Sequence, residues 1–527
     1  MAYRSLTPTE MADLEERGCR STSWALIQVD TEFTTDTLRN VHFDGEVRLG
    51  KGVRIHNVGI IRTTDGATFG EDNLISVKNE AGDGNVVIYS ALTSQAAALM
   101  VRTAEEEDNA LFAKLRNMAT LYAREVMPPC TTIGDNVTIM DCRELTNVAI
   151  GSDCELCGAS RLIDCTLSST PDAAIYVGDD VIMENVVVQA GATIVDGAKL
   201  YDSFVGEACH IGRGFTSEGS LFFANSHMDN GESCAALCGP FSVSHHKSSL
   251  LIGGEYSFYN AGSGTNFSNH AYKMGPIHYG TLERGSKTAS GAHILWPAHI
   301  GAFSMVMGKV QTHPDTSLLP FSYVIGEGRK THLVPGRNLC TVGTYRDVTK
   351  WPKRDKRPAS GRLSLISYEW LSPYVIERIK AGIQCLTDMQ DEQGYDAEEY
   401  TANGFTISQS ALQHGLEFYR HALRMYGNAN STSDWTDLLG LLTPTEAVEQ
   451  IKEDILNDDI ADITTLESRF RDIYDSYDQW KGCSDNDSDT SQAHEAWLNA
   501  IRHDAEREYD MGDVSEAQIT EFLENVQ

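Results

Sequence analysis

Residues 133–162, IGDNVTIMDCRELTNVAIGSDCELCGASRL, repeat an aliphatic residue at intervals of six. Ile133, Ile139 and Leu145 form one run, and a second run starts at Ile150 after a short slip. The same interval separates Val41, Val47 and Val53, and also Val188, Ile194 and Leu200. An α-helix repeats its apolar positions every three or four residues, so a helix cannot produce this spacing.

A small residue follows many of these aliphatic positions, and an acid or an amide often comes next. Examples are the segments Ile133-Gly134-Asp135-Asn136 and Val177-Gly178-Asp179-Asp180. One inward aliphatic residue in every six is typical of a triangular solenoid of short parallel strands. The pattern resembles the hexapeptide-repeat family, so we predict a mainly β protein with a left-handed parallel β-helix. A right-handed parallel β-helix has longer and less regular coils, which the strict interval disfavours.

Two segments depart from the repeat and read as helical. Residues 94–128 are rich in Ala, Leu, Met and Glu and end at consecutive prolines, which predicts a helical insertion. Residues 364–527 predict an acidic α-helical domain, with helices that include 396–426 and 433–441. The expected organisation is an N-terminal segment with the first coils over 1–93, the insertion over 94–128, the main β-helix with the active site over 129–350, a basic linker over 351–363 and the helical domain over 364–527.

The composition excludes several classes of protein. The 527 residues carry a formal net charge of −33, which argues against nucleic-acid or anionic-membrane partners. No apolar run approaches the roughly 20 residues that span a bilayer, and the N-terminus lacks the apolar core of a signal peptide. The 12 cysteines are scattered, as expected for reduced thiols. We therefore expect a cytoplasmic protein without membrane or nucleic-acid partners.

The charge is unevenly distributed. Residues 210–359 carry 15 Lys and Arg against 9 Asp and Glu, whereas residues 360–527 carry 11 against 34. The basic region also holds ten of the 16 histidines. Concentrated imidazoles and cations suit a site for an anionic ligand, so we place the functional site in this region.

Several segments of the basic region resemble a large bacterial hexapeptide-repeat family known only as a domain of unknown function. They are SFYNAGSGTNFSNHAYKMGPIHYGTLERGSKT at 257–288, LWPAHIGAFSMVMGK at 295–309, HPDTSLLPFSY at 313–323 and KWPKRDKR at 350–357. That resemblance supplies no activity. Similarity to hexapeptide-repeat enzymes in general implies a homotrimer with active sites between neighbouring solenoids.

The first functional hypothesis is a transferase that acts on a small anionic, hydroxylated substrate such as a sugar phosphate. A histidine acts as general base, and fixed cations bind the anionic group. The resemblance implies an acyl-CoA donor. The expected catalytic residues are His246, His270, His278 and Glu283. The expected substrate-binding residues are Lys247, Asn266, Asn269, Lys273, Arg284, Lys287, Trp296 and Lys309.

The second hypothesis is a metal-dependent lyase or hydrolase, similar to the γ-class carbonic anhydrases. A catalytic metal needs about three protein ligands and an open position. His227 and His245 lie 18 residues apart, one full coil of a regular solenoid, so we expect their rings to stack on neighbouring strands. The expected ligands of the divalent metal are His227, His245, His270 and His278.

A third hypothesis is a non-catalytic scaffold. In this case the acidic helical region over 360–527 binds a basic partner, and the histidines have no role in the function.

Overall fold

The computed structural model describes residues 3–80, 82–104, 109–268, 279–427, 434–481, 488–510 and 515–525. The chain forms two compact units. The first unit comprises Met1–Gly254, Lys356–Leu365 and Lys452–Ser468, and the second comprises Glu255–Asp355, Ile366–Ile451 and Arg469–Gln527. The protein is rich in strands, most of which belong to a large and mostly parallel sheet. No helix in these described ranges is both long enough and apolar enough to cross a membrane.

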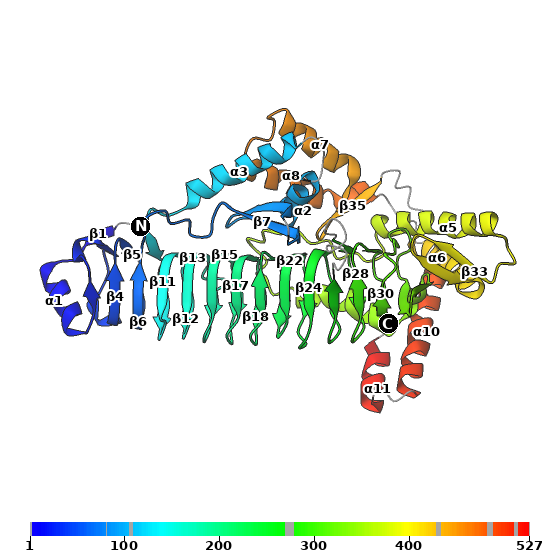
Figure 1. Ribbon diagram of the computed structural model, residues 1–527, viewed down its shortest axis with the longest axis horizontal. Helices are drawn as coiled ribbons and strands as arrows, with labels where there is room; N and C mark the ends of the chain where they lie inside the picture. The colour runs from blue at the N-terminus through cyan, green and yellow to red at the C-terminus, as the bar shows by residue number, and fades with distance from the viewer. Residues whose placement is uncertain are drawn as a thin grey trace. The chain divides into compact units, whose positions relative to one another are not determined.

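Short parallel strands of the first unit stack in columns, as the row of strands in Figure 1 shows. One column contains β10 (Thr138–Met140), β12 (Glu155–Cys157), β14 (Tyr176–Val177), β16 (Thr193–Ile194), β18 (His210–Gly212), β21 (His227–Asp229) and β23 (Val243–Ser244). A second column contains β11 (Glu144–Ile150), β13 (Arg161–Ser168), β15 (Ile182–Gln189), β17 (Lys199–Val205), β19 (Thr216–Glu218), β20 (Leu221–Phe222) and β22 (Glu232–Cys238). Before them lie β1 (Tyr3–Ser5), α1 (Pro8–Glu16), β3 (Ile27–Asp30), β4 (Leu38–Asp44), β5 (Val47–Leu49) and β6 (Arg54–Arg62), and β9 (Thr131–Ile133) pairs with β5 and β11.

The repeated aliphatic side chains form the core of this unit. Ile139 pairs in register with Leu156, and Ile211 pairs with Met228; all four side chains are fully buried. These partners are 17 residues apart rather than the expected 18. Two steps of six are followed by one step of five in these turns, because a corner uses one residue fewer.

The acids and amides after the small residues occupy the corners between strands. Asn136 has φ 57° and Asp153 has φ 59°, in the left-handed region that Asn and Asp tolerate better than most residues. Equivalent corners are tied together, since the Asn136 amide donates to the Asp153 carboxylate at 3.4 Å. The corners therefore account for the second half of the sequence motif.

Two helices lie where the sequence predicts the helical insertion: α2 (Ser94–Thr103) and α3 (Ala110–Val126). The Thr93 side chain caps α2 by accepting from the Ala96 N–H. Before them, β7 (Asn73–Asn79) and β8 (Asp83–Ile88) form an antiparallel pair. The buried Gln95 amide exchanges two hydrogen bonds with the backbone of Leu365, which holds a distant segment of the chain in the first unit.

The second unit contains both strands and helices. Its strands include β25 (Asn266–Ser268), β26 (Thr281–Leu282), β27 (Lys287–Thr288), β28 (His293–Leu295), β29 (His299–Ile300), β30 (Met305–Val310), β31 (Tyr323–Glu327) and β32 (Lys330–Val334). Its helices include α4 (Val342–Arg354), α5 (Pro373–Gln393), α6 (Gln409–Tyr426), α10 (Ser488–Asp510) and α11 (Glu516–Asn525). Helices α7 (Thr445–Leu456) and α8 (Ile463–Asp475) each contain residues of both units.

The prediction of helical structure is wrong for parts of two segments in the C-terminal region. The segment 396–426 begins with a hairpin of β33 (Glu399–Ala402) and β34 (Phe405–Ser408), and α6 starts only after it. Asn403 and Gly404 both have positive φ, as a two-residue hairpin turn requires. The segment 433–441 contributes to another hairpin, β35 (Trp435–Leu438) with β36 (Leu441–Pro444), because Leu439 and Gly440 form the same kind of turn.

A buried ion pair gives a test of the first unit. Glu207 accepts from Arg357 and from the N–H groups of Leu363 and Ser364, and both charged residues are 5% exposed. Replacing Glu207 by Gln removes the carboxylate from this buried ion pair, so we expect the free energy of unfolding to fall by about 3–5 kcal/mol. Urea denaturation measures this change. The exposed Glu155→Gln is the matched control, and equal effects of the two substitutions would contradict the assignment.

Candidate metal centre

Three side chains from two neighbouring strands of the first unit meet on one outer face. In the parallel pair β18–β21, His210 lies opposite His227 and Gly212 lies opposite Asp229. Side chains alternate along a strand, and the residues between these positions point into the core. His210, His227 and Asp229 therefore project outward from the same side of the sheet.

The distances between the three side chains are short. His227 Nε2 lies 3.0 Å from Asp229 Oδ2, and His210 Nε2 lies 3.4 Å from Asp229 Oδ1. One ligand atom from each of the three residues lies within 4.8 Å of the others. The rings of the two histidines are 4.5 Å apart between centroids. The cluster is compact enough for all three residues to contact one ion.

Gly212 provides the space for this cluster. A Cβ at this position would lie 3.1 Å from Asp229 Oδ1 and 3.2 Å from His210 Nε2. A larger residue opposite Asp229 would therefore push the carboxylate and the imidazole apart. The backbone of Gly212 lies outside the left-handed region, so the need for glycine here is one of space.

The surroundings of the cluster leave lone pairs of Asp229 and His210 available to an ion. Asp229 is 3% exposed, and its Oδ1 has no hydrogen-bond donor among the described residues. Burial, followed by the neighbouring His227, lowers the pKa of His210, although Asp229 opposes this effect. His210 is therefore neutral at pH 7, the protonation state in which imidazole binds a metal.

The three groups match a known class of metal ligands. Zn–N and Zn–O bonds are about 2.0–2.2 Å long, so the ligand atoms around one ion lie roughly 3–3.5 Å apart. The two distances to Asp229 fall in this range. Two histidines and one carboxylate form the ligand set of non-haem iron sites and of some zinc hydrolases, and they leave coordination positions open for water and substrate.

The structure changes the set of ligands that the sequence predicts. His227 belongs to the cluster, but its register partners are His210 and Val243, not His245. The centroid of the His245 ring lies 5.9 Å from that of His227 and 4.3 Å from that of His246. His245 and His246 are both exposed. His270 and His278 lie outside the described residues. The 17-residue spacing of His210 and His227 was the signal that would have found the pair.

A second arrangement of charged groups lies in the second unit around Glu283. The His299 Nε2 is 2.9 Å from Glu283 Oε1, and the Arg378 Nε is 3.4 Å from Glu283 Oε2. Burial lowers the pKa of His299, but the hydrogen bond and charge of Glu283 outweigh burial and raise it above 6.5. Glu283 thus orients a histidine that is itself partly exposed, as an acid–base pair requires.

The other predicted substrate-binding residues are found in different settings. In the second unit, Asn266 and Lys309 lie opposite His293 on adjacent parallel strands and so form one row. Arg284 and Lys287 pair with Asp437 and Asp347, and Trp296 is fully buried against Phe267. In the first unit, His246 and Lys247 lie in an exposed turn after β23. Asn269 and Lys273 lie outside the described residues.

Comparisons with known proteins give a family without a stated activity. The model of a family described as a domain of unknown function (DUF4954) matches residues 3–54 and 49–390. A second model, described as a domain of unknown function (DUF6819), matches residues 419–486. A search of curated proteins finds no match. Neither family description states an activity.

We expect chelator-treated protein to bind one Zn²⁺, Fe²⁺, Co²⁺ or Mn²⁺ ion per chain. Loss of a contact that supports a metal ligand costs roughly 10–100-fold in affinity. We expect a larger loss of affinity for each of three substitutions: His210→Ala, Asp229→Asn and Gly212→Ala. Isothermal titration calorimetry and elemental analysis measure affinity and stoichiometry. His56→Ala, at a half-buried histidine of β6 in the same unit, is the control. Equal binding by Asp229→Asn and His56→Ala would place the ion elsewhere.

The Glu283–His299 contact predicts a specific titration. Glu283→Gln removes the charge that favours imidazolium, so the pKa of His299 should fall, and NMR of the histidine Cε1–H groups detects this shift. Because the folded-state pKa is raised, the contact stabilises the fold fully below pH 6.5 and loses this effect as the pH rises through the raised value. Asp315 interacts more weakly with His299, so Asp315→Asn should lower the pKa of His299 less than Glu283→Gln does. A larger effect of Asp315→Asn would contradict the pairing of His299 with Glu283.

Proposed function

Since the chain belongs to the DUF4954 family, whose description states no activity, we propose from the site geometry that the protein is a metal-dependent lyase or hydrolase. The observation that carries this proposal is the convergence of His210, His227 and Asp229. Three ligands that leave open positions are the arrangement of a catalytic site, whereas structural zinc sites have four protein ligands.

The chemistry of the site follows from its ligands. A bound divalent ion would lower the pKa of a water ligand and so supply a nucleophile at neutral pH. Asp229 is the buried negative charge of the cluster, and the neutral His210 adds a ligand without adding charge. The lowered pKa of His210 favours the neutral imidazole, which is the form that binds a metal.

Cations beside the cluster favour an anionic substrate. Arg213 directly follows β18, its side chain is 66% exposed, and its Nε lies 3.6 Å from Asp229 Oδ2. The charge of Lys356 also acts on His210 and lowers its pKa. An exposed guanidinium can bind a carboxylate or phosphate bidentately next to the metal. We therefore propose a small anionic substrate.

We propose that the stacked strands form a left-handed parallel β-helix of the hexapeptide-repeat type. Turns of 17 residues with two steps of six and one of five support this proposal. The homotrimer, the cytoplasmic location and the lack of nucleic-acid and membrane partners stay predictions. The transferase also stays a prediction, because His270, His278, Asn269 and Lys273 lie outside the described residues. Assays of turnover distinguish the scaffold hypothesis from the two enzyme hypotheses.

Metal-dependent turnover tests the proposed function. The metal-free protein, reloaded with each divalent ion in turn, is assayed for CO₂ hydration and for hydrolysis of p-nitrophenyl acetate and p-nitrophenyl phosphate. We expect activity only after reloading, and His227→Ala should lower kcat by at least about 100-fold because it removes a ligand. Arg213→Gln should raise KM for the phosphate ester and leave that for the neutral ester unchanged.

The control for Arg213→Gln is Arg39→Gln, at an exposed arginine of β4 in the same unit. Activity that survives chelation, or acyl-CoA-dependent transfer that requires His246 and no metal, would favour the transferase. A complete absence of turnover, together with loss of partner binding after deletion of 360–527, would favour the scaffold.

A further inference from the structure

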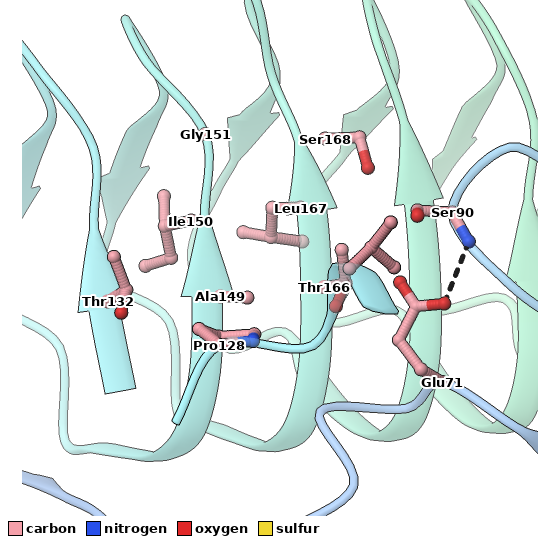
Figure 2. A pocket seen from close by; sticks show the side chains of 11 residues that line it. Glu71, Ser90, Pro128, Thr132, Ala149, Ile150, Gly151, Thr166, Leu167 and Ser168 are labelled. Carbon is pink, nitrogen blue, oxygen red and sulfur yellow. Dashed lines mark hydrogen bonds between the residues drawn. The ribbon is translucent and has the colours of Figure 1, made fainter. Parts of the chain in front are cut away.

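An open surface cavity of about 290 Å³ lies in the first unit, and its lining includes none of the residues of the metal cluster. Its floor comes from three neighbouring strands, with Thr132 on β9, Ala149 and Ile150 on β11, and Leu167 on β13. Val126 at the end of α3 and the following Pro128 cover one side. Figure 2 shows Thr132, Ile150 and Leu167 in a row across the three strands, with the Glu71 carboxylate beside Thr166 and Ser90 at one end.

The lining combines apolar surface with a single titratable group. Eleven residues line the cavity: Glu71, Ser90, Val126, Pro128, Thr132, Ala149, Ile150, Gly151, Thr166, Leu167 and Ser168. Glu71 is the one carboxylate among them, and the lining contains no lysine, arginine or histidine. Apolar walls with a few convergent polar groups are typical of small-molecule sites.

Glu71 is an unusual residue to find in such a place. It is 2% exposed, and its Oε2 accepts from the Ser90 N–H at 2.9 Å. Burial raises the pKa of Glu71 to about 7, although hydrogen bonds from Ser90 and Thr166 oppose this effect. Buried carboxylates are normally paired with a cation, since burial of an isolated charge is costly.

The charged and titratable groups packed near Glu71 do not supply such a cation. Asp72 follows it in the chain and raises its pKa further. Tyr89 and Tyr122 both interact electrostatically with Glu71 and with Glu467. All four of these groups are acids or phenols. None of these four groups offers Glu71 a positive charge, and a cation bound in the cavity would supply it.

We infer that this cavity binds a small primary amine with a short apolar body, its ammonium group paired with Glu71 and its body lying on Ala149, Ile150 and Leu167. An ammonium group provides the counter-charge that the protein does not provide, and the net charge of −33 attracts cations. The apolar floor accepts a hydrocarbon body of limited length. This inference does not depend on the metal cluster.

The pH dependence of binding tests the inference. The probes are n-butylamine, n-butanol and butyrate, which share a chain and differ in the head group, and ligand-observed NMR titration gives each Kd. Deprotonated Glu71 binds the ammonium, so the Kd of n-butylamine should be about tenfold lower at pH 8 than at pH 6. The alcohol and the acid should bind more weakly than the amine at pH 8.

Two substitutions identify the cavity as the site. Glu71→Gln should abolish the pH dependence and raise the Kd of the amine at pH 8 at least tenfold. Ala149→Phe fills the floor but keeps the carboxylate, and it should also abolish binding; it serves if Glu71→Gln does not fold. Glu155→Gln, at an exposed acid of β12, should change nothing. Equal or tighter binding of n-butanol or butyrate, amine binding that survives both cavity substitutions, or no binding at all would overturn the inference.

Discussion

In-register pairing of parallel strands at intervals of about 17 residues is the constraint on which the rest of the first unit depends. Backbone hydrogen bonds between neighbouring strands place equivalent residues of successive turns side by side. Aliphatic residues then form continuous buried rows, and the Asn and Asp residues of the corners form rows of their own. The same pairing brings His210 next to His227 and opens the space at Gly212 that Asp229 occupies.

Buried acids of this protein differ in how their charge is balanced. Glu207 has the guanidinium of Arg357, and Glu283 has His299 and Arg378. Asp229 has two histidines and Arg213, which is more exposed. For Glu71, the described neighbours supply hydrogen bonds but no cation. The first two arrangements are complete within the chain, whereas the last two are suited to a ligand that brings positive charge.

Two of the cations expected at an anion site show why composition is a weak guide to function. Arg284 and Lys287 lie in the basic region, yet the fold buries them against Asp437 and Asp347 of distant segments. Asp437 comes from the acidic part of the chain and Asp347 from the basic region itself, so pairing within the second unit balances part of the basic charge. Arg213 lies in the same region and remains exposed beside the metal cluster. Residue type alone does not separate these two outcomes.

The sequence by itself determined the repeating strands of the first unit, because each step needs one buried aliphatic residue and one corner residue, and both are local requirements. It also placed helices at 94–128, where apolar residues have helical spacing. The hairpin turns at Asn403-Gly404 and Leu439-Gly440 were local signals too, but the helical pattern around them obscured them. Only the tertiary structure decided that His210 and His227 meet each other and Asp229 rather than His245, since the pairing register selects one of several possible spacings. It also decided that Glu71 faces a cavity, because the residues that bury this carboxylate come from segments far apart in the chain.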